Sequence, residues 1–178
     1  MTTRHEPRAA EAPSDPAGGL SALVVDDEKN IRTTLSVCLE GLGCRVASAA
    51  SGEAALAALV RQSFDLAFVD LRLGEESGLD LLPRLLAQNP GLAVIVVTAY
   101  ATIDTAVEAI RRGAVEVLPK PFTPAQIRLC VEQVAERRRL DRRLSELEAR
   151  LAEAVPEIDL DTGSPRMRAI LDVAARAA

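Results

Sequence analysis

The segment FDLAFVD, residues 64–70, is a short apolar run that ends in the carboxylate of Asp70. Apolar residues at helical spacing lie before and after it, at 51–62 and 77–88. A short apolar run between two helical patterns is typical of a strand in a parallel sheet that helices cover on both faces. The segment therefore predicts an α/β fold.

The same alternation continues in both directions along the chain. Further strands are expected at 21–25, 44–49, 92–98 and 114–119, and further helices at 28–42, 101–112 and 123–154. Ser51 and Thr123 are expected to cap the helices that follow them, and Pro124 suits the first turn of the last helix. Five strands alternating with five helices predict a doubly wound, flavodoxin-like domain with a five-stranded parallel sheet in the order 2-1-3-4-5.

Composition limits the classes of function. The chain has 178 residues, enough for one full domain and some extra, and a net charge of −5. This mild acidity argues against DNA binding by bulk electrostatics. Aromatic residues make up only 2 % and tryptophan is absent, which argues against stacking on single-stranded nucleic acid.

Signals for disulfides, zinc and membranes are sparse. Cys38, Cys44 and Cys130 contain no C-x-x-C pair, which argues against a disulfide framework or a zinc site and fits a reducing cytoplasm. The one histidine, His5, lies in a polar segment, so histidine-based catalysis is not expected. No apolar run reaches the roughly 18 residues of a membrane span and no signal peptide is evident, so a cytoplasmic location is expected.

Polar side chains gather at the carboxyl ends of the predicted strands. Asp26 and Asp27 follow the first strand, and Asp70 ends the third. Thr98 ends the fourth strand and Lys120 follows the fifth. This edge is the functional edge of an open parallel sheet, and strands 1 and 3 are neighbours in the expected order, so their acids meet.

This residue set suits phosphoryl chemistry. Three clustered carboxylates raise one another's pKa unless a cation joins them, and their oxygens suit Mg²⁺. With Thr98 as a donor and Lys120 as a point charge, the carboxylate of Asp70 can attack a phosphate and become an aspartyl phosphate. Taken singly, a strand-end Asp caps a helix, a strand-end Thr closes a turn and a Lys lies on the surface, but the joint pattern is hard to obtain by chance.

Four motifs at these strand ends carry a family resemblance over about residues 20–135. LVVDDE (23–28), FVDLRL (68–73), VTAY (97–100) and LPKPF (118–122) resemble the receiver domain of bacterial two-component response regulators. The resemblance implies a regulatory phospho-acceptor rather than an enzyme. Its phosphoryl donor would be a sensor histidine kinase, and its state would switch the attached output domains.

The resemblance also implies a role for each site residue. Asp70 is the phospho-acceptor, Thr98 the switch hydroxyl and Lys120 the phosphate-binding lysine. A cis peptide bond is expected between Lys120 and Pro121. The implied Mg²⁺ ligands are Asp26, Asp27, Asp70 and the backbone carbonyl of Arg72.

One position departs from the family pattern. Receivers usually carry Tyr or Phe three residues before the Lys, and here that position is Val117. Tyr100, the single tyrosine, is either a candidate substitute or a half-exposed loop aromatic.

The last helix carries a further apolar seam. Leu140, Leu144, Leu147 and Leu151 repeat at heptad spacing. This seam predicts a parallel homodimer through residues 137–154, with packing on the chain's own receiver or on an ATPase domain as the alternative. Residues 163–178 resemble the start of the central ATPase domain in NtrC-type, sigma-54-dependent activators. DLRLGEESGLD (70–80) is most similar to their AlgB alginate-regulator branch.

The expected organisation has four parts. They are a disordered tail at 1–19, a receiver domain at 20–135, a helical coiled-coil linker at 136–162 and the start of a truncated ATPase domain at 163–178. The chain has no G-x-x-x-x-G-K-[ST] motif, so no ATP hydrolysis is expected from it. Contacts with DNA and sigma-54 RNA polymerase are expected only through domains that this chain lacks.

Three other functions fit parts of the pattern. A haloacid-dehalogenase-like phosphatase needs Asp-x-Asp at its nucleophile, whereas this chain has Asp70-Leu71-Arg72. A flavodoxin-like cofactor binder needs a glycine- and hydroxyl-rich phosphate loop after the first strand, where this chain has Asp26-Asp27-Glu28. A degenerate receiver that only docks partners would not need the intact acids, Thr and Lys. Labelling by acetyl phosphate separates these alternatives.

Overall fold

The computed structural model describes residues 19–154. Its main sheet holds five parallel strands: β1 (Ser21–Val25), β2 (Arg45–Ala49), β3 (Leu66–Asp70), β6 (Ala93–Thr98) and β7 (Glu116–Pro119). They lie in the order β2-β1-β3-β6-β7, which is the predicted doubly wound 2-1-3-4-5 order. Two short strands that the sequence did not predict, β4 (Arg72–Leu73) and β5 (Glu76–Ser77), form a separate antiparallel hairpin.

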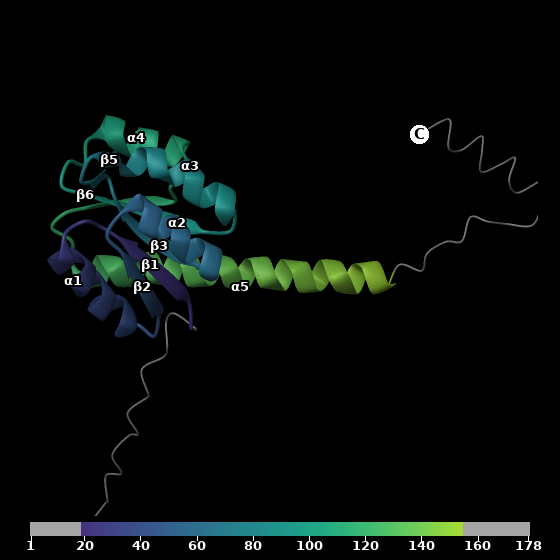
Figure 1. The fold of residues 1–178 in the computed structure, drawn as a ribbon. Coiled ribbons are helices and arrows are strands. Elements are labelled where there is room, and N and C mark those ends of the chain that lie inside the picture. The colour runs from purple at the N-terminus through teal and green to yellow at the C-terminus, as the bar shows by residue number, and fades with distance from the viewer. Residues whose placement is uncertain (1–18, 155–178) are drawn as a thin grey trace, which may run out of the picture. The chain divides into compact units, whose positions relative to one another are not determined.

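Helices cover both faces of the sheet (Figure 1). One face carries α1 (Lys29–Glu40) and the first turns of α5 (Pro124–Ala154). The other carries α2 (Gly52–Arg61), α3 (Gly78–Gln88) and α4 (Ile103–Arg111). Each layer has its own hydrophobic cluster, so the sheet separates two cores.

The central strand β3 contributes to both cores. Leu66 and Phe68 belong to the cluster with α1 and α5, whereas Ala67 and Val69 belong to the cluster with α2, α3 and α4. This division follows from the strand period of two, which turns successive side chains to opposite faces. All five residues of β3 are buried, and the strand delivers Asp70 to the carboxyl edge of the sheet.

Both predicted helix caps are present. The Ser51 hydroxyl accepts the N–H of Ala54 at 3.2 Å at the start of α2. The Thr123 hydroxyl accepts the N–H of Gln126 at 3.3 Å at the start of α5. These bonds satisfy backbone donors that a helix start otherwise leaves unpaired.

The element boundaries lie within two residues of the predicted ones, and two of the differences have a clear local cause. Helix α4 begins later than expected because the hydroxyl of Thr102 caps it by accepting the N–H of Thr105 at 3.2 Å. Strand β7 begins at Glu116 rather than at 114. The reason is that the Ala114 N–H turns back to the carbonyl of Ala109, near the end of α4, at 3.0 Å.

The chain divides into two units, one through Arg138 and one from Arg139. In the second unit α5 presents the predicted leucine seam, each member of which is at least half exposed: Leu140, Leu144, Leu147 and Leu151. The expected tail before Gly19 and the expected ATPase segment lie outside the described residues. Within 19–154, no helix combines the length and hydropathy needed to cross a membrane.

Candidate functional site

Asp70 ends β3 and is 7 % exposed. Its Oδ1 accepts the N–H of Arg72 at 3.2 Å, and its Oδ2 accepts from the Lys120 ammonium at 2.7 Å. The helix-capping alternative for Asp70 is wrong, because α3 begins at Gly78 with Ser77 as its N-cap residue. A Cβ at Gly78 would lie 2.0 Å from the Asp70 carbonyl oxygen, so only glycine lets α3 start this close to β3.

Asp26 is more deeply buried, at 1 % exposure. Its Oδ1 accepts the N–H of Glu28 at 2.8 Å, and its Oδ2 accepts from the Lys120 ammonium at 2.8 Å. Burial raises the pKa of the Asp26 carboxyl above its ordinary value, although the hydrogen bonds from Lys120 and Glu28 oppose the shift. Arg32 braces the loop by donating to the carbonyl oxygens of Asp26 and Asp27 at 2.7 and 2.8 Å.

The Lys120 ammonium lies between Asp26 and Asp70, and its side chain is only 12 % exposed. Burial alone would lower the pKa of this ammonium, but its hydrogen bonds to the two carboxylates outweigh burial and raise the pKa above the ordinary lysine value. The expected cis bond to Pro121 is present. Lys120 is therefore an internal counter-ion of the site rather than a surface lysine.

Asp27 is exposed and completes an acid cluster. One oxygen each from Asp26, Asp27 and Asp70 lie within 4.8 Å of one another, the one such group of potential metal ligands in residues 19–154. Oxygens this close suit a hard divalent ion that keeps several waters, because the ion offsets the repulsion between carboxylates. The donor set therefore fits the expected Mg²⁺.

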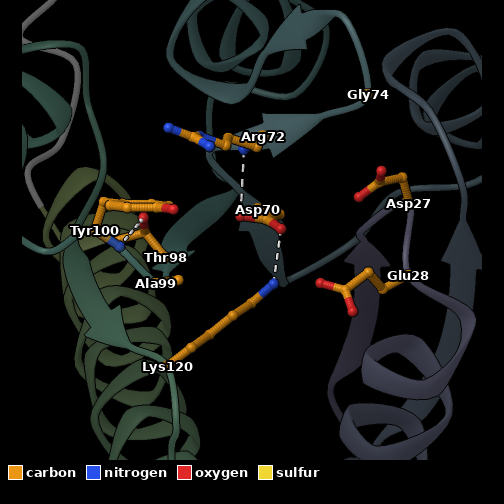
Figure 2. Close-up of a pocket in the computed structure, with 9 residues that line it drawn as sticks. All are labelled: Asp27, Glu28, Asp70, Arg72, Gly74, Thr98, Ala99, Tyr100 and Lys120. Atoms are coloured by element: carbon orange, nitrogen blue, oxygen red, sulfur yellow. Dashed lines mark hydrogen bonds and ion pairs between the residues drawn. The ribbon is translucent and has the colours of Figure 1, made fainter.

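A cleft of about 340 Å³ opens beside these acids (Figure 2). Its lining residues are Asp27, Glu28, Asp70, Arg72, Gly74, Thr98, Ala99, Tyr100 and Lys120. Thr98 is 2 % exposed, and its Oγ1 accepts the N–H of Tyr100 at 3.0 Å. Thr98 thus fills an ordinary turn role and also lines the cleft. The predicted strand-end residues meet at one place, although they come from separate parts of the chain.

One contact in the cleft was not expected. The guanidinium carbon of Arg72 lies 4.2 Å from the centroid of the Tyr100 ring. The family resemblance implies a role only for the backbone carbonyl of Arg72, as a Mg²⁺ ligand, and none for its side chain. The sequence indicates this contact only by position. A cationic residue lies two residues after Asp70, and an aromatic residue lies two residues after Thr98.

A family model for the response regulator receiver domain matches residues 22–132. The chain belongs to this receiver family. It is 46 % identical over 156 residues to the alginate biosynthesis transcriptional regulatory protein AlgB of Pseudomonas putida. That match covers 88 % of this chain and 34 % of the relative, so the receiver chain spans about a third of the length of the curated relatives it matches.

Two solved structures are similar to this receiver. One is NtrX from Brucella abortus in complex with ADP, with a TM-score of 0.69 and 33 % identity, covering 89 % of this chain and 35 % of that one. Another is a response regulator protein from Burkholderia pseudomallei with a phosphorylated aspartic acid, a calcium ion and citrate. Its TM-score is 0.61 at 33 % identity, covering 71 % of this chain and 74 % of that one. The predicted likeness to NtrC-type regulators and to the AlgB branch is confirmed.

Val117 stands at the position where the family resemblance predicts Tyr or Phe. This side chain is half-buried in β7 and packs against the cluster beneath α2, α3 and α4. Family membership also overturns the phosphatase and flavodoxin-like alternatives. An aromatic is nevertheless close to the site, in the form of the exposed Tyr100.

Proposed function

We propose that the receiver accepts a phosphoryl group on Asp70 from a sensor histidine kinase, with Mg²⁺ bound, and so switches its output domains. The observation that carries this proposal is the placement of the Asp70 carboxylate. It lines an open cleft, within 4.8 Å of two further acids and 2.7 Å from a lysine ammonium. The phosphorylated aspartic acid and calcium ion of the Burkholderia pseudomallei protein support the same chemistry here.

The transfer needs one nucleophile from this chain. A carboxylate oxygen of Asp70 attacks the phosphorus and the phosphorus–nitrogen bond to the kinase histidine breaks. The imidazole leaves with the bond electrons and takes up a proton. The groups proposed to hold Mg²⁺, whose charge offsets that of the carboxylates and the phosphoryl group, are Asp26, Asp27, Asp70 and the Arg72 carbonyl.

Lys120 and Thr98 are proposed to hold the product. The phosphoryl group brings more charge and three strong acceptor oxygens close to the Lys120 ammonium. The Thr98 oxygen accepts from Tyr100, so its own proton can be donated to a phosphoryl oxygen. These contacts engage the ends of β6 and β7, and we expect the face that includes α4 to carry the change to a partner.

The output is proposed to be transcriptional, since the relatives are transcriptional regulators. In this proposal 20–135 is the receiver, 136–162 a coiled-coil linker that makes a homodimer through 137–154, and 163–178 the start of an ATPase domain. DNA and sigma-54 RNA polymerase would be engaged by further domains. A cytoplasmic location follows from such an output.

Acetyl phosphate tests the acceptor directly. Incubation with acetyl phosphate and Mg²⁺ should add one phosphoryl group to the wild-type chain, as measured by intact-protein mass. Asp70→Asn should remove this labelling while circular dichroism stays unchanged. Asp104→Asn, at an exposed acid of α4 outside the cleft, is the matched control and should label normally. Full labelling of Asp70→Asn would move the acceptor elsewhere, and an unlabelled wild type would favour a docking-only receiver.

A further inference from the structure

Two loops at the mouth of the cleft are joined through side chains. Arg72 lies in β4, just after Asp70, and Tyr100 lies in the segment just after β6. Figure 2 shows the Arg72 side chain extending away from Asp70 to the Tyr100 ring, 4.2 Å from its centroid. The Tyr100 ring is otherwise largely open, since the residue is 60 % exposed.

Tyr100 has a second attachment to the same site. Its N–H donates to Oγ1 of Thr98 at 3.0 Å. Both attachments of Tyr100 therefore end on residues that line the cleft around Asp70. A phosphoryl group on Asp70 that binds Arg72 or Thr98 would therefore also change the contacts of Tyr100.

The charges around Arg72 favour a new anionic partner. Lys120 is already shared between Asp26 and Asp70. Within residues 19–154 the Arg72 guanidinium contacts the Tyr100 ring and forms no ion pair with a carboxylate. A cation on an exposed ring is held weakly, whereas a guanidinium binds phosphate oxygens through paired, charge-assisted hydrogen bonds.

We propose that Arg72 exchanges partners when Asp70 is phosphorylated. In the free receiver its guanidinium holds the Tyr100 ring, and in the phosphorylated receiver it binds phosphoryl oxygens and releases the ring. Arg72 thus binds the phosphoryl group and converts the charge on Asp70 into a change at Tyr100. The inference rests on phosphorylation of Asp70.

The chain carries its own probe for this exchange. Tyr100 is the single tyrosine and tryptophan is absent, so intrinsic tyrosine fluorescence reports on this ring alone. Fluoroberyllate with Mg²⁺ serves as the phosphoryl mimic, added to the full chain. Quenching by acrylamide should increase when the mimic binds, because the ring loses the guanidinium that covers one face.

Two variants isolate the role of Arg72. In Arg72→Ala, quenching should be high without the mimic and should not increase with it. Fluoroberyllate should also bind about tenfold more weakly, the equivalent of one charge-assisted hydrogen bond. Arg84→Ala is the matched control, because Arg84 pairs with Glu76 of the same β4–β5 hairpin but lies outside the cleft lining. It should behave as the wild type.

Acetyl phosphate labelling separates the two proposals. If the wild type is not labelled on Asp70, the phospho-acceptor function itself fails. If Asp70 is labelled but the wild-type quenching does not change, the partner exchange is wrong and the receiver function stands. An increase in Arg72→Ala equal to that of the wild type overturns the exchange in the same way.

Discussion

Replacing Lys120 by methionine removes the ammonium from the site while keeping most of the volume of the side chain. The Lys120 ammonium donates to Asp26 at 2.8 Å and to Asp70 at 2.7 Å, and the two carboxyl side chains are only 1 % and 9 % exposed. Without the ammonium, two carboxylates with oxygens within 4.8 Å of each other repel unopposed. At an effective dielectric constant of about 20, that repulsion is roughly 3 kcal/mol.

We therefore expect Lys120→Met to lower the free energy of unfolding by about 3 kcal/mol at neutral pH, near the cost of breaking a buried ion pair. A typical stability of about 5–15 kcal/mol exceeds this loss, so the variant should still fold. Urea unfolding followed by circular dichroism measures the change. Adding Asp26→Asn to the variant should restore most of the loss, because the repulsion then disappears.

The loss should depend on pH and on Mg²⁺. Burial already raises the pKa of Asp26, and removal of Lys120 takes away a group that lowers it. A carboxyl with a raised folded-state pKa binds a proton on folding, so stability rises as the pH falls through that value. The deficit of Lys120→Met should shrink as the pH falls toward 3.8, the ordinary pKa of the group, and also with saturating Mg²⁺. A deficit under about 1 kcal/mol at neutral pH, or one unchanged by acid, would refute this account of Lys120 as the counter-ion.

Three further changes test other parts of the structure. Asp27→Ala should weaken Mg²⁺ binding in calorimetry yet leave the free energy of unfolding level or higher, because it removes both a metal ligand and a source of repulsion; a clear loss of stability would support a capping role instead. Gly78→Ala should lower the free energy of unfolding by about 3 kcal/mol or more, because its Cβ would lie 2.0 Å from a backbone oxygen of β3; unchanged urea unfolding would contradict that clash. Light scattering should show the chain as a dimer and the Leu144→Asp, Leu147→Asp double variant as a monomer, and a wild type that stays monomeric at high concentration would exclude the coiled-coil dimer.

The sheet and the meeting of the strand-end residues could be predicted because they depend on order along the chain. A parallel doubly wound sheet places every strand's carboxyl end at one edge, so Asp70, Thr98 and Lys120 had to converge. The hairpin of β4 and β5 could not be predicted, since two-residue strands are too short to show a period.

The contacts that the site side chains make in the free receiver could not be predicted from the sequence. Lys120 was expected to face a phosphate, yet in the free receiver it binds Asp26 and Asp70, because burial makes an unpaired charge costly. The contact of Arg72 with Tyr100 depends on how two loops approach each other. A pattern in one sequence does not encode that approach.

Strand β3 packs in both hydrophobic cores, which separates the site of phosphorylation from the groups that respond to it. Both cores pack against that strand and all five of its residues are buried, so the carboxylate that we propose as the acceptor lies on a firmly held part of the sheet. We therefore expect the movement that follows phosphorylation to occur in exposed segments, such as the one that carries Tyr100. In the exchange that we propose, a substitution at Tyr100 would therefore change how the phosphorylated state is recognised, while the strand that carries Asp70 keeps its packing.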